Sequence, residues 1–158
     1  MIRPKKLDAN LLAAEWSLHL LSPESLIDLA VQALVEGYDG KALVELAGLT
    51  NPSREPYEVL QKLAIPAIRE LGAAIPSTAD AAILLTARVC SQIISGQLDA
   101  VEGAIWIQNH IYYKTEGFRW LIPFVGPASE CEDRPDQHNF YCSQILKAAQ
   151  DFLSQHPL

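Results

Sequence analysis

The sequence predicts an all-α fold, a helical bundle or a short array of helical hairpins with about seven helices. Helix-capping residues and glycine stops recur along the whole chain. Between them, apolar residues repeat at the three- and four-residue spacing of a helix face, and no segment requires a strand. With 158 residues, of which 49% are apolar, the chain can bury a core without disulfides. We therefore expect a single all-α domain over residues 1–158.

Two helices are expected before Gly37. The first begins at Asp8 and extends to Leu21, with leucines spaced for a broad apolar face. Ser22 caps the second, and Pro23 takes its first position, where the missing N–H has no cost. Gly37 is the expected stop of this second helix because glycine adopts the left-handed conformation easily.

A short helix and a proline-containing helix follow. Asp39 is the expected cap of the short helix over residues 41–47. Pro56 begins the next helix, which ends at Gly72. Pro66 lies inside it and removes one backbone hydrogen bond, so we expect a kink or a break into two short helices.

Three further helices are expected in the second half of the chain. Ser77 caps a fifth helix that ends at Gly96 and is apolar almost all round, which predicts the centre of the domain. Asp99 caps a sixth, which ends near Tyr113. The last covers residues 134–155, with one apolar side.

Two segments are expected to lie outside helices: a mobile basic tail over residues 1–7 and a long aromatic-containing connection over residues 114–133. The connection holds an apolar run that something must cover. Tryptophan, arginine and other large side chains dominate the binding energy of protein interfaces. One interpretation therefore makes this run a partner-binding surface, whereas the other packs it across the domain's own core. The expected partner-binding residues are Phe118, Arg119, Trp120, Leu121 and Phe124.

The charge balance excludes some partners. With 19 acidic against 12 basic residues, the net charge of −7 opposes binding to a phosphate backbone. A helix-turn-helix made of the second and third helices is also a poor reader of bases, because residues 41–47 hold one basic side chain. The most apolar stretch, residues 81–94, is shorter than the roughly 20 residues of a membrane span. We expect neither nucleic acid nor membrane as partner.

The cysteines bear on compartment and chemistry. Cys90, Cys131 and Cys142 are odd in number and widely spaced, which is typical of a reducing compartment and predicts a cytoplasmic protein. His138 and Cys142 are four residues apart, hence on one helix face, and Cys131 precedes them in a segment that can fold back. Thiolates and imidazole at such spacing can hold zinc. The alternative is one core cysteine, one loop cysteine and acidic residues that favour a helix N-terminus.

One segment resembles a known pattern. Residues 37–49, Gly-Tyr-Asp-Gly-Lys-Ala-Leu-Val-Glu-Leu-Ala-Gly-Leu, are similar to the G-Y-D-x-x-x-L-x-x-L-A-G-L element of uncharacterised small all-helical bacterial proteins. Residues 94–104 look like a second element of the same kind of protein. The resemblance implies a bacterial helical protein and no established activity.

No phosphate-binding glycine motif, zinc-protease motif or nucleophile elbow is present, which disfavours the common enzyme classes. We expect no cofactor. The leading hypothesis is a non-enzymatic protein-interaction protein, either a homo-oligomer or an acidic binder of a basic protein. The alternative is a metal-binding protein or metal-dependent enzyme that uses Cys131, His138 and Cys142.

Overall fold

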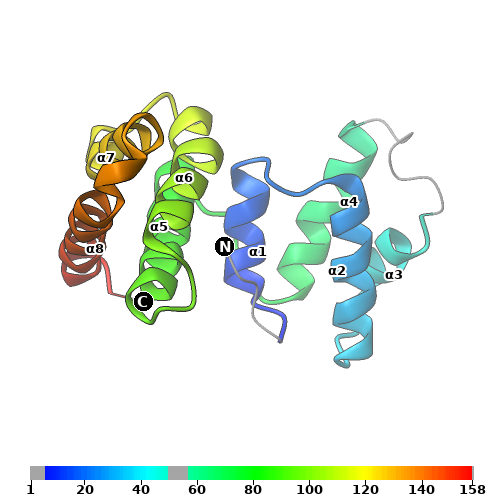
Figure 1. The fold of residues 1–158 in the computed structure, drawn as a ribbon. Helices are drawn as coiled ribbons and strands as arrows, with labels where there is room; N and C mark the ends of the chain where they lie inside the picture. The colour runs from blue at the N-terminus through cyan, green and yellow to red at the C-terminus, as the bar shows by residue number, and fades with distance from the viewer. Residues whose placement is uncertain (1–5, 50–56, 158) are drawn as a thin grey trace. The chain divides into compact units, whose positions relative to one another are not determined.

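The computed structural model describes residues 6–49 and 57–157, and within these ranges the chain forms eight α-helices and short 3-10 turns without a strand. The all-α prediction is confirmed. The chain divides into two compact units, one of residues 4–77 and one that includes residues 78–158. Figure 1 shows the first unit in blue to green and the second in green to red. The single domain stays a prediction.

The unit of residues 4–77 holds four helices: α1 (Ala9–Ser17), α2 (Pro23–Val35), α3 (Lys41–Ala47) and α4 (Tyr57–Glu70). The short α3 packs against both α2 and α4, and α1 also contacts α4. The core is made mostly of leucine and alanine, and Ala33, Leu43 and Ala64 are almost completely buried. Alanines at helix contacts let the backbones approach closely, which suits helices of only two to four turns.

The expected side-chain cap of the second helix is confirmed, and the first helix also begins at a side-chain cap, Asp8. An Oδ1 atom of Asp8 accepts a hydrogen bond from the backbone N–H of Leu11 at 3.0 Å. The Ser22 hydroxyl accepts one from the N–H of Ser25 at 3.1 Å. Each bond satisfies a donor that would otherwise lack a partner at the helix start.

The first helix ends at Ser17, earlier than the expected Leu21. His19 takes the left-handed conformation with φ of 54°, and the N–H of Leu20 donates back to the carbonyl of Glu15 at 2.9 Å. A backbone hydrogen bond of this kind commonly ends a helix after a left-handed glycine, and here His19 takes the place of the glycine. The apolar spacing continues past Ser17, so the sequence pattern alone does not indicate where this helix ends.

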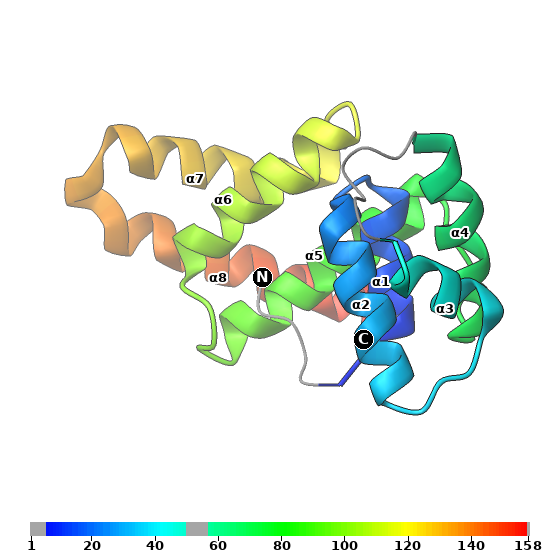
Figure 2. The same cartoon turned by 90° about the vertical axis from the view of Figure 1, so that its right-hand side faces the viewer.

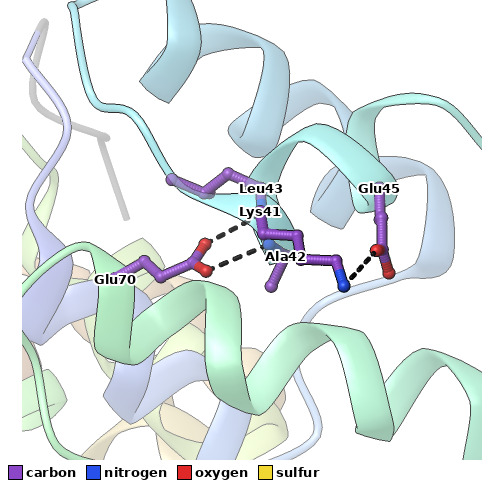
Figure 3. Close-up of polar contacts among 5 residues, drawn as sticks. All are labelled: Lys41, Ala42, Leu43, Glu45 and Glu70. Carbon is purple, nitrogen blue, oxygen red and sulfur yellow. Dashed lines mark hydrogen bonds and ion pairs between the residues drawn. The ribbon is translucent and has the colours of Figure 1, made fainter.

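The start of α3 is capped by a residue from another helix. Asp39 was the expected cap, but Gly40 is the N-cap residue and offers no side chain. The carboxylate of Glu70, at the end of α4, instead accepts from the N–H groups of Ala42 and Leu43, each at 3.0 Å (Figure 3). The Asp39 prediction is wrong because a distant carboxylate takes the two backbone donors.

The fourth helix is continuous from Tyr57 to Glu70 with Pro66 inside it, so the break into two short helices is absent, and the kink stays a prediction. Pro66 is exposed, while Ala64 and Ala67 are buried. Packing of the buried side outweighs the single lost hydrogen bond. The predicted start at Pro56 lies outside the described residues.

The second unit holds α5 (Thr78–Ile94), α6 (Ala100–His110), α7 (Ile122–Asp133), α8 (His138–Gln155) and the 3-10 turns η2 (Tyr112–Lys114), η3 (Arg119–Leu121) and η4 (Pro135–Gln137). The predicted fifth helix is α5, which packs against α6 and α8 and has its side chains buried at Ala81, Leu85 and Val89. The turn η4 joins α7 to α8 in a hairpin, seen in orange to red in Figure 2.

The long connection expected over residues 114–133 is mostly helical, and that prediction is wrong. Its second half is α7, and η2 and η3 occupy part of the rest. Pro123 lies in the first turn, where it is tolerated, but Pro127 lies inside the helix. Gly126 and Pro127 resemble a turn in the sequence. The helical spacing is visible in the positions that the structure buries: Leu121, Phe124, Ala128 and Cys131.

Residues 1–5, most of the predicted basic tail, lie outside the described ranges. Across the residues that the structure does describe, no helix combines the length and apolarity needed to cross a membrane.

Candidate metal centre

The imidazole of His138 lies between two thiols. His138 is the first residue of α8, and Cys142 follows one turn later on the same face. The Nε2 atom of His138 is 3.3 Å from Sγ of Cys142. The Nδ1 atom is 3.4 Å from Sγ of Cys131, near the end of α7. The turn η4 folds α7 back onto the start of α8, so all three residues predicted as metal ligands meet at one ring.

A fourth residue, Asp99, completes the group, and the sequence analysis assigned it only a capping role. Asp99 is the N-cap of α6, where Oδ1 accepts from the N–H groups of Val101 at 2.9 Å and Glu102 at 3.1 Å. One ligand atom from each of Asp99, His138 and Cys142 lies within 4.8 Å of the other two. Nothing in the local spacing of Asp99 signals this role, because only the packing of α6 against α8 places it there.

The ring geometry divides the predicted trio. The two nitrogens of an imidazole point outward on different sides of the ring, so one ion bound at Nε2 does not also reach a group bonded to Nδ1. Cys142 lies on the Nε2 side of the ring and Cys131 on the Nδ1 side. Asp99 groups within 4.8 Å with His138 and Cys142, and Cys131 is not a member of that group. The set that can share one ion is therefore Asp99, His138 and Cys142.

The separations suit a tetrahedral ion. Bond lengths of about 2.3 Å to sulfur and about 2.0 Å to nitrogen place neighbouring ligands about 3.5 Å apart in a tetrahedral zinc site. The observed 3.3 Å between Sγ of Cys142 and Nε2 of His138 is close to that value. Asp99 and His138 are exposed and Cys142 is half-buried, so an ion can enter from solvent.

The electrostatics at Cys142 oppose an isolated thiolate. Partial burial, together with the negative charges of Asp99 and Cys131, raises the pKa of the Cys142 thiol above its ordinary 9.0. A divalent cation would reverse this effect, because it stabilises the thiolate and releases the proton. Several acidic side chains around the end of α7 and η4 are exposed and add to the attraction for a cation: Glu130, Glu132, Asp133 and Asp136.

The predicted partner-binding residues do not share one environment. Leu121 and Phe124 are 0% and 1% exposed, so both belong to the core of their unit. Phe118 and Trp120 are half-buried, and Arg119 is exposed. The expected surface is therefore smaller than predicted, because the residues from Leu121 onward turn their apolar side inward as α7 begins.

The rings at this place form a stack beside a shallow hollow. Trp120 stacks on Phe118 at a centroid distance of 5.6 Å and on Phe152 of α8 at 5.4 Å. A hollow of about 260 Å³ opens between Trp120 and Pro123 on one side and Phe152 and His156 on the other. The segment is thus part core and part surface, and each of the two interpretations of the sequence describes only one part of it.

No protein-family model matches this sequence, and neither the curated proteins nor the solved structures contain a significant match. The resemblance of residues 37–49 to uncharacterised helical bacterial proteins stays a prediction. Physically, the segment is explained by burial of Leu43 and Leu46 and by the Glu70 cap.

Proposed function

We propose that this chain is a metal-binding protein that holds one Zn²⁺ ion with Asp99, His138 and Cys142. The observation that carries the proposal is the convergence of one oxygen, one nitrogen and one sulfur ligand atom within 4.8 Å. These atoms come from the starts of two different helices, α6 and α8. Over residues 6–49 and 57–157, no second group of this kind is found.

The mixed donor set favours zinc. Mg²⁺ and Ca²⁺ prefer oxygen ligands alone, whereas Zn²⁺ accepts sulfur, nitrogen and carboxylate oxygen together. Imidazole and a single thiolate also suit Fe²⁺ and Co²⁺, and zinc exceeds both in general affinity for such sites. The exposed acidic residues beside η4 supply a negative field that favours any divalent cation.

The test is a zinc titration of protein purified under reducing conditions without a histidine tag and stripped with a chelator. We expect one equivalent to bind in calorimetry. Cys142→Ser and Asp99→Asn should each weaken binding at least about tenfold, since even the loss of an outer partner costs this much. Asparagine caps helices as well as aspartate does, so Asp99→Asn keeps the start of α6 intact.

Asp28→Asn is the matched control, because it removes the same charge from an exposed position in α2, which belongs to the other unit, and should change affinity little. Failure of the wild-type chain to bind an equivalent of zinc would refute the proposal. So would equal binding by the wild type and both ligand variants.

A second candidate function, contact with a protein partner or a second copy of this chain, is favoured by the hollow beside Trp120. Partly exposed tryptophan and exposed arginine are the residues that anchor interfaces. Trp120→Ala should then lower the sedimentation mass at high protein concentration, or release a basic partner captured at low salt. If Trp120→Ala only lowers the melting temperature, the stack is core and this candidate fails.

A further inference from the structure

We infer that the ion at this site keeps one exchangeable position, which takes a small monodentate donor such as water or azide, with Cys131 outside the coordination sphere. The inference rests on the proposed zinc site and concerns what that site can bind.

Cys131 contacts a different ring nitrogen of His138 from the one that Cys142 contacts, so it cannot bind the ion that Cys142 binds. Its sulfur is 3.4 Å from Nδ1 of His138, whereas the sulfur of Cys142 is 3.3 Å from Nε2. Asp99 groups with His138 and Cys142 and not with Cys131. An ion on Nε2 leaves the proton on Nδ1, and that N–H donates to Sγ of Cys131. Metal-bound histidines generally donate their second N–H in this way, which fixes the ring and its tautomer. Cys131 is thus a positioning residue.

The ligand number leaves a vacancy in the coordination shell. Zinc in proteins is tetrahedral, and sites with three protein ligands complete the shell with water or substrate. Asp99, His138 and Cys142 are three ligands, and among the described residues no fourth histidine, cysteine, aspartate or glutamate joins the same 4.8 Å group. Two of the three are exposed, so the remaining position is reached from solvent.

The charge of the ion with its ligands and the single open coordination position determine which donors can bind. One carboxylate and one thiolate already neutralise the two positive charges of the ion, so no surplus charge draws in a multivalent anion. A single donor atom replaces water without displacing protein ligands. The site therefore suits small monodentate ligands rather than chelating ones.

Co²⁺ is the probe, since it takes zinc's geometry and absorbs visible light. It also gives a near-ultraviolet charge-transfer band whose intensity is proportional to the number of cobalt–thiolate bonds. For the Co²⁺-loaded full chain, azide should shift the visible bands and saturate at one equivalent per ion. Cys142→Ser should abolish the thiolate band. Cys131→Ala should weaken Co²⁺ binding roughly 10- to 100-fold while the thiolate band per bound ion keeps its intensity. Cys131→Ser, whose hydroxyl also accepts from Nδ1–H, should recover most of the affinity.

Each other result overturns the inference in a recognisable way. Loss of about half of the thiolate band per bound ion in Cys131→Ala would make Cys131 a ligand and the site closed. Bands that do not respond to azide would mean that the fourth position is filled by the protein. Both results leave the zinc site itself standing, whereas failure of the wild-type chain to bind Co²⁺ and Zn²⁺ would refute the proposed function as well.

Discussion

At the scale of single residues, the three cysteines lie in three different environments. Cys90 is fully buried in α5, and burial raises the pKa of its thiol from 9.0 to about 12. Cys131 is buried against Nδ1 of His138, and Cys142 is half-buried beside Nε2. Cys90 thus acts as an apolar core side chain, whereas the other two belong to the candidate metal centre.

The Cys90 pKa predicts a loss of stability in alkali. The folded chain keeps this thiol protonated up to about pH 12, whereas an unfolded chain ionises it near 9.0. Between these values the folded state binds more protons, so the free energy of unfolding falls as pH rises, by up to about 1.4 kcal/mol for each pH unit. Denaturant titrations between pH 8 and 11 should show this slope.

The wild-type chain is compared with Cys90→Ala, because this variant lacks only the Cys90 thiol and keeps every other ionisable group. Its stability at pH 8 should be lower, since it loses buried volume, but its decline above pH 9 should be shallower. Equal slopes for the two proteins would contradict the argument.

At the scale of elements, α3 depends on another helix for its start. A helix of seven residues is too short to be stable by itself in water. Glu70 of α4 satisfies two of its first N–H groups, as Figure 3 shows, and Leu43 and Leu46 anchor its buried side. The Lys41–Glu45 ion pair on the outer face is exposed and adds little.

Gly40 is expected to matter because of this cap. A Cβ atom at Gly40 would collide with the carboxylate of Glu70. We expect Gly40→Ala to displace that side chain and to destabilise the protein by about 1 kcal/mol, a typical cost of a lost cap. Glu70→Ala should cost a similar amount. In denaturant titrations the double variant should cost no more than Glu70→Ala alone, because the two changes remove one interaction.

The Lys41–Glu45 pair provides the control for this cycle. Glu45→Ala also removes a carboxylate near α3, and should cost less than about 0.5 kcal/mol. If the destabilisation by Gly40→Ala and by Glu70→Ala is additive, the Glu70 cap is not the reason why position 40 requires glycine.

The proline in α4 gives a second prediction at this scale. Pro66 is exposed and leaves the carbonyl of Lys62 without its helical donor. Alanine supplies the N–H and has a much better helix propensity, so Pro66→Ala should stabilise the protein by about 1 kcal/mol or more. The midpoint of thermal unfolding measures the change. A lower midpoint would mean that the packing around α4 needs the proline at this position.

At the scale of the whole molecule, two units of helices each have their own core. The candidate metal centre lies entirely in the unit that contains α5–α8, where it links the start of α6 to the start of α8. The Glu70 cap lies entirely in the other unit. We therefore expect metal binding to act directly on one of the two units.

Hydrogen exchange of the intact chain should reveal this asymmetry. Saturating zinc stabilises whatever state binds it, by about 2.7 kcal/mol at a hundredfold excess over the dissociation constant. Amides in the first turns of α6 and α8 should become more protected, while those of α2 and α3 should change little. At the same zinc concentration Asp99→Asn should show a smaller effect, about 1.4 kcal/mol or less if its dissociation constant is at least tenfold higher. Protection that rises equally throughout the wild-type chain would contradict a local link.

Much of the fold could be predicted because its signals are local. Asp8, Ser22 and Asp99 bond to backbone groups within three residues, so their capping roles are readable from the sequence. Helix α7 was missed because Gly126 and Pro127 resemble a turn, although the apolar spacing from Leu121 to Cys131 is helical. Packing of the buried side of α7 outweighs the tendency of Gly126 and Pro127 to form a turn.

The sequence by itself determined the all-α class, most helix positions and the three residues around the candidate centre that are close in the chain. Tertiary structure decided which side of the His138 ring each thiol occupies, brought Asp99 to the candidate metal centre, and placed Glu70 at the start of α3. The physical reason is the same in each case. Periodicity and capping act over a few residues, whereas ligand geometry and caps between helices depend on how distant elements pack.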